Sequence, residues 1–129
     1  MDKAPLVMDE IDAGKALVER LNDHFPVIAA CWLREDEGGE RYLYVALDGL
    51  TVPKADLAYG EVIRIAGAMK DHYIDPFRVK LIGPTHPIAK AVLDIYRRFP
   101  GRIPTRFDGP VAGGMAVAEV YIYPPLKKP

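Results

Sequence analysis

The chain of 129 residues contains no serine and only one cysteine, Cys31. The lack of serine excludes acyl transfer through a serine nucleophile. A single cysteine excludes both an internal disulfide and a zinc site built from cysteines. The three histidines, His24, His72 and His86, are far apart and show no short His-x-His or His-Glu spacing. We therefore expect no metal and no cofactor.

Long apolar runs and an excess of one charge are also missing. No apolar segment approaches the roughly 18 to 20 residues that span a bilayer. The N-terminal segment "MDKAPLVMDEID" is acidic and lacks the apolar centre of a secretion signal. We therefore expect a cytoplasmic protein with no membrane association. The formal net charge of -1 gives no overall attraction to nucleic acid or anionic lipid.

Half of the residues are apolar, which is enough for one compact core. We expect a single α/β domain over residues 1–129, with residues 1–8 and 124–129 flexible. Apolar spacing of three and four residues predicts helices, and alternation predicts strands. The predicted helices cover residues 9–25, 53–72 and 87–99, and the predicted strands cover 27–35, 41–48, 77–82, 102–107 and 114–123.

The order of these elements is α-ββ-α-β-α-β(β), which predicts an α+β protein with a mixed sheet of four to five strands. Each helix has one apolar face, and all three helices can share one face of the sheet. The expected architecture is a two-layer α/β sandwich with three helices packed on one face. A three-layer arrangement is the alternative.

In a two-layer sandwich the second sheet face carries aromatic and basic side chains. If Cys31 and Val45 face the helices, strand alternation turns Trp32 and Tyr44 to the open side. That face holds four of the seven tyrosines and the only tryptophan. Aromatic residues are enriched in protein interfaces. We therefore predict a protein interface made of Trp32, Tyr42, Tyr44, Arg78, Lys80, Tyr121 and Tyr123.

Three interpretations of this face remain open. Aromatic side chains on neighbouring strands can simply stabilise a solvated sheet. A second copy of the chain or another protein can cover them, since monomers seldom expose large apolar patches. Single-stranded nucleic acid can stack on aromatic sheet platforms, although the overall charge and the lack of an RNA-binding signature disfavour it. We expect a homodimer or a protein partner.

Arginines gather in the segment "YRRFPGRIPTRF", where residues 96–107 contain no acidic side chain. Convergent guanidinium groups bind phosphate or carboxylate, and a following glycine-rich loop offers backbone N–H groups. The candidate anion site consists of Arg98, Arg102, Arg106, Gly113 and Gly114. The alternative is structural, because basic side chains suit the solvated last turn of a helix.

No catalytic constellation is apparent. Cys31 points inward from a buried strand, which predicts an inert thiol with a raised pKa. Asp48, Asp75 and Asp108 stand in turns, where hydrogen bonds to the backbone account for them. We therefore expect a non-catalytic binding or assembly module. The alternative is a binding protein or enzyme for a small anionic molecule, phosphate or carboxylate, held by the segment 97–106 and the adjacent glycine loop. In the second helix Gly60 and Gly67 lie on one flank, where a neighbour could approach closely, although helices also tolerate such glycines.

Overall fold

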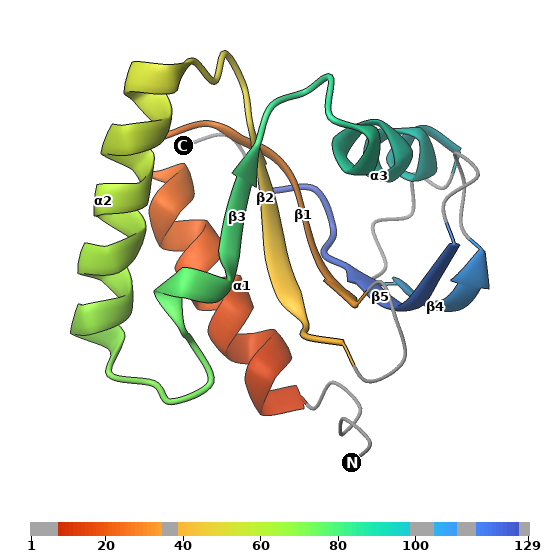
Figure 1. Ribbon diagram of the computed structural model, residues 1–129, viewed down its shortest axis with the longest axis horizontal. Helices are drawn as coiled ribbons and strands as arrows, with labels where there is room; N and C mark the ends of the chain where they lie inside the picture. Colours follow the sequence, from red (N-terminus) through yellow and green to blue (C-terminus); the bar gives the residue numbers. More distant parts are fainter. Residues whose placement is uncertain (1–7, 35–38, 99–104, 111–115, 127–129) are drawn as a thin grey trace.

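Three helices and five strands make up the described part of the protein (Figure 1). The computed structural model describes residues 8–34, 39–98, 105–110 and 116–126, with the backbone alone for 105–110 and 116–119. The helices are α1 (Met8–Asn22), α2 (Val52–Met69) and α3 (Pro87–Arg98). The strands are β1 (Val27–Arg34), β2 (Tyr42–Leu47), β3 (Val79–Ile82), β4 (Thr105–Pro110) and β5 (Ala116–Ile122). This order confirms the predicted α+β class.

The strands form one mixed sheet in the order β3-β2-β1-β5-β4. Strand β1 is central and pairs antiparallel with both β2 and β5, while β5 also pairs antiparallel with β4. Strands β2 and β3 run parallel. A parallel pair needs a long crossover connection, and α2 supplies it.

Local sequence signals account for the helix ends. The Thr51 side chain accepts a hydrogen bond from the Lys54 N–H at 3.3 Å and caps α2, which has a proline in its first turn. Lys70 ends α2 in the left-handed conformation, with φ 52°. After α1, the Asn22 Oδ1 accepts a hydrogen bond from the Val27 N–H at 2.9 Å, which fixes the corner between α1 and β1.

The prediction that all three helices pack on one face of the sheet is wrong. Helices α1 and α2 cover one face and α3 covers the other, so the sheet is the middle of three layers (Figure 1). The core is accordingly divided in two. The first cluster joins α1 and α2 to the strand residues Trp32 and Val45, and the second joins α3 to Cys31 and Tyr44.

The error lies in the register between strands. Alternation within β1 and within β2 is as predicted, but Trp32 lies opposite Leu43, and Cys31 lies opposite Tyr44. Residues directly opposite each other share a sheet face. Trp32 and Tyr44 therefore point to opposite faces. Both strands are buried on both faces, and alternation within one strand does not fix its phase relative to the next.

The predicted strand 77–82 is also shorter than expected. Residues Pro76–Arg78 form a 3-10 turn, η1, and β3 begins at Val79. The Asp75 Oδ1 accepts a hydrogen bond from the Phe77 N–H at 2.9 Å, which starts this turn. Phe77, at the start of the predicted strand, is 85% exposed.

The segment Pro124–Leu126 follows β5 without regular secondary structure. Leu126 nevertheless packs against the core cluster under α1 and α2. The rest of the predicted flexible ends lies outside the described residues, apart from Met8, which is the first residue of α1.

Candidate functional site

Trp32 and Tyr123 form a buried polar contact beneath α1. The Trp32 indole N–H donates to the Tyr123 hydroxyl at 2.9 Å, and this hydroxyl donates to the Ile11 carbonyl at 2.6 Å. Gly14 leaves the room for both side chains, because a Cβ there would lie 2.8 Å from the Trp32 Nε1. Burial raises the pKa of Tyr123 well above its ordinary value. The contact therefore joins α1 to the sheet, and its polar atoms satisfy one another.

The other aromatic residues of the predicted interface lie on both sides of the sheet: Tyr42 and Tyr44 on the α3 side, and Tyr121 on the side of α1 and α2. Tyr44 is buried in the α3 cluster, and Tyr42 is half-buried beside it. The Lys80 Nζ lies 4.2 Å from the centre of the Tyr42 ring and 5.8 Å from that of Tyr44, a cation–π arrangement. Tyr121 packs against the α1 and α2 cluster, 5.2 Å from the Tyr123 ring.

These positions rule out a single open aromatic surface. Trp32, Tyr44 and Tyr123 are buried by helices of the same chain. Arg78 and Lys80 are exposed, but Arg78 belongs to η1 rather than to the sheet. Partner binding by the members that remain accessible stays a prediction.

The arginine segment is described only in part. The Arg98 Nε lies 3.0 Å from the Asp94 carboxylate, and Arg97 pairs with the same carboxylate. Both pairs follow the helical spacing of exposed ion pairs, as the structural alternative expects. Arg102, Gly113 and Gly114 lie outside the described residues, and the backbone of Arg106 in β4 pairs with Tyr121. The anion site therefore stays a prediction.

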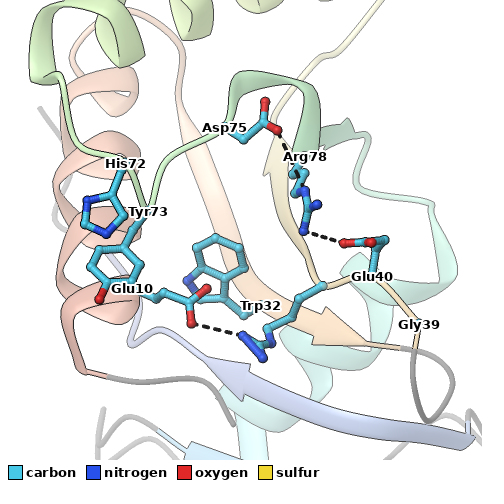
Figure 2. A pocket seen from close by; sticks show the side chains of 9 residues that line it. Glu10, Trp32, Gly39, Glu40, His72, Tyr73, Asp75 and Arg78 are labelled. Atoms are coloured by element: carbon cyan, nitrogen blue, oxygen red, sulfur yellow. Dashed lines mark hydrogen bonds and ion pairs between the residues drawn. The ribbon is translucent and has the colours of Figure 1, made fainter. Parts of the chain in front are cut away.

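A cavity of about 310 Å³ opens at the beginning of β2 and β3, beside the first turns of α1 (Figure 2). Trp32 forms its floor. The loop after α2 forms one wall with the rings of His72 and Tyr73, whose centres lie 4.2 Å apart and whose planes are tilted by 35°. Charged side chains from η1 and the loop before β2 form the opposite wall. The lining residues are Glu10, Trp32, Gly39, Glu40, Arg41, His72, Tyr73, Asp75 and Arg78.

The charges around this cavity pair with one another. The Arg41 Nη1 lies 3.0 Å from the Glu10 carboxylate, and both side chains are largely buried. Arg78 pairs with Glu40, and its Nε lies 3.7 Å from the Asp75 carboxylate (Figure 2). A charged ligand would have to displace a carboxylate from its guanidinium partner, which costs free energy. These pairs tie α1, η1 and the loop before β2 together, and they favour a structural role for the cavity wall.

Cys31 and His86 both occupy structural positions. Cys31 is buried, and burial raises the pKa of its thiol to about 12, as the sequence predicted. No three histidine, cysteine, aspartate or glutamate side chains gather to hold a metal within the described residues. His86 caps α3, since its Nδ1 accepts a hydrogen bond from the Ile88 N–H at 3.1 Å.

The raised thiol pKa predicts a loss of stability at alkaline pH. The unfolded thiol ionises near its ordinary value of 9.0, while the folded thiol keeps its proton to about pH 12. Above pH 9 the unfolded state therefore binds fewer protons, and the free energy of unfolding falls as pH rises. From pH 8 to 10.5 this single group should remove about 2 kcal/mol.

Urea unfolding at both pH values measures this loss. The Cys31→Ala variant is the control and should lose correspondingly less stability over the same interval, because it lacks the thiol. It should still lose some stability, because burial also raises the pKa of Tyr96 and Tyr123. Equal losses in the wild type and in the variant would contradict the assignment of a buried, protonated thiol.

Large apolar side chains are exposed on α2. Val52 is 80% exposed, Leu57 68% and Ile63 53%, while Tyr59 lies at the border of exposure. Phe77 of η1, beside α2, adds a further exposed ring. We call Val52, Tyr59 and Ile63, which lie seven and four residues apart on one side of the helix, the α2 outer face, while Leu57 is exposed on a different side. This helix is the outermost element on its side of the molecule (Figure 1), and no other element of the described chain covers these side chains.

On α2 the sequence pointed to one apolar side and to the flank of Gly60 and Gly67. The apolar side holds the buried residues Ala58, Val62 and Ile65. The outer face was missed, although a signal for it existed. Val52 and Ile63 are apolar at positions that the amphipathic pattern assigns to solvent. The cavity was missed because its charged residues are brought together only by tertiary structure.

No helix in the described ranges combines the length and the apolar character needed to cross a membrane. Comparison of the chain with protein-family models, with curated proteins and with solved structures found no match.

Proposed function

We propose that this protein is a non-catalytic binding module that recognises a protein partner through the α2 outer face. The exposed apolar side chains of α2 carry this proposal. Burying a leucine, isoleucine, valine or aromatic side chain contributes about 1.5–3 kcal/mol relative to leaving it exposed. Large apolar side chains concentrated on one exposed element are typical of a binding surface.

Three of the aromatic side chains first assigned to the interface, those of Trp32, Tyr44 and Tyr123, are buried and support the fold instead. Trp32 and Tyr123 satisfy each other beneath α1, and Tyr44 packs under α3. The proposed binding surface therefore moves from the sheet to α2. We retain a cytoplasmic location as part of the proposal, since a buried free thiol such as Cys31 suits a reducing compartment.

Site-specific photo-crosslinking in cells tests this surface. A photoreactive p-benzoylphenylalanine at position 63 should give a discrete adduct, because Ile63 lies in the middle of the exposed face. The same group at position 90, where Lys90 is exposed on α3, is the control. Equal adduct yields at both positions, or none at position 63, would count against binding through α2.

A further inference from the structure

The outward positions of α2 form a stripe with unusual internal symmetry. Residues three, four and seven apart share one side of a helix. This spacing aligns five exposed positions of α2 with the exposed C-cap residue Lys70, and we call these six residues the Ile63 stripe: Asp56, Tyr59, Gly60, Ile63, Gly67 and Lys70. The stripe has an apolar centre, an acidic end and a basic end.

Each end of the stripe complements the other about Ile63. Asp56 lies seven residues before Ile63, and Lys70 lies seven residues after it. Tyr59 lies four residues before Ile63, and Gly67 lies four residues after it. Two antiparallel copies of α2 with a two-fold axis at Ile63 would therefore place opposite charges together and a large side chain against a small one. An isologous interface requires this kind of self-complementarity.

The two glycines of the stripe are not required by packing against any described residue. A Cβ at Gly60 or at Gly67 would meet no atom within 4 Å, and neither residue has positive φ. Glycine inside a helix costs about 1 kcal/mol relative to alanine. Missing side chains at these positions would let the backbone of a second helix approach closely. The glycines thus add to the argument from apolar exposure and charge.

Two N–H groups at the edge of the sheet next to α2 are already hydrogen-bonded within the chain. Strand β3 is an edge strand. Its Leu81 N–H donates to the Tyr59 hydroxyl at 2.9 Å, and its Val79 N–H bonds to the Pro76 carbonyl. Satisfied edge groups discourage strand addition. On this side of the molecule, association between two copies is therefore expected through the surface of α2 rather than through β3.

We propose that the partner of the α2 outer face is a second copy of this chain, bound antiparallel across a two-fold axis at Ile63. This inference rests on the proposed function of the face, and it names the partner. In the dimer, Ile63 packs against Ile63 of the other copy, and each Asp56 pairs with the Lys70 opposite. A small crossing angle, as in helices packed at about 20°, keeps both charge pairs within reach.

Sedimentation equilibrium measures the oligomeric state of the protein directly. At about 100 µM, above the micromolar dissociation constant expected of a small interface, the wild type should have twice the chain mass of 14.3 kDa. The Ile63→Glu variant should be a folded monomer, since it places two carboxylates at the axis. Its circular dichroism spectrum reports whether the fold is kept, and the fold should tolerate the change because Ile63 is 53% exposed.

Charge reversal provides a sharper test of the geometry. Asp56→Lys and Lys70→Asp should each raise the dissociation constant about tenfold, because each sets like charges together twice in the dimer. The double variant should recover the wild-type affinity to within about threefold, since it restores opposite charges. Lys90→Asp on α3 is the control and should leave the affinity unchanged.

Different failures have different meanings. A wild-type monomer at this concentration would overturn self-pairing, while a cross-linked adduct of another mass at position 63 would leave the proposed function standing. A dimer that persists in Ile63→Glu would place the interface elsewhere. If the double charge reversal fails to rescue dimerisation, the two-fold arrangement at Ile63 is wrong.

Discussion

Replacing Trp32 with alanine should lower the free energy of unfolding by about 3–5 kcal/mol. Trp32 is 4% exposed and packs in the cluster beneath α1 and α2. Its removal leaves a cavity in the core and deprives the Tyr123 hydroxyl of its donor. The indole also floors the cavity of Figure 2, so water would gain access to the sheet. Urea denaturation followed by circular dichroism measures the change.

Phe77→Ala is the matched control for this prediction. It also removes a large ring, but Phe77 is 85% exposed in η1. Its truncation should change the free energy of unfolding by less than about 0.5 kcal/mol. Similar losses for the two variants would mean that Trp32 lies on the surface, as an open aromatic sheet face requires.

The Gly14→Ala variant should be destabilised by about 1–3 kcal/mol, although alanine is the better helix former. The added Cβ would collide with the Tyr123 hydroxyl and would lie 2.8 Å from the Trp32 Nε1. Neither atom can move freely, since the hydroxyl also donates to the Ile11 carbonyl. The collision would therefore separate α1 from the sheet or break the buried hydrogen bonds. Thermal and urea unfolding of the variant measure the loss.

Gly60→Ala is the control, and the opposite sign is expected. Its new Cβ would meet no atom of the described residues within 4 Å. At low chain concentration, where the monomer is populated, it should raise the free energy of unfolding by about 0.5–1 kcal/mol. Destabilisation of equal size in both variants would contradict the different environments of the two glycines.

Local patterns identified most elements because they depend on neighbours in sequence. Helix α3 occupies residues 87–98, close to the predicted 87–99, since Pro87 favours its first turn and its apolar spacing is regular. The predicted strand began two residues before β3. The alternation of Phe77 and Val79 is typical of a strand, but Asp75 caps a 3-10 turn at this point. Such local patterns predicted little of the candidate site. Of the residues that line the cavity, only Trp32 and Arg78 had been predicted to belong to a site, and the α2 outer face had not been predicted.

The sequence by itself determined the order of elements, the α+β class, the inner side of each helix and the burial of the Cys31 thiol. Each follows from the period of apolar residues along a single segment. Only the tertiary structure decided which sheet face each strand residue occupies and which helix covers it. Trp32 and Tyr44 were separated by the pairing of Trp32 with Leu43, and that register depends on packing between distant segments. Alternation has a period of two in every strand, so it leaves the relative phase of two strands free until the layers on both sides fix it.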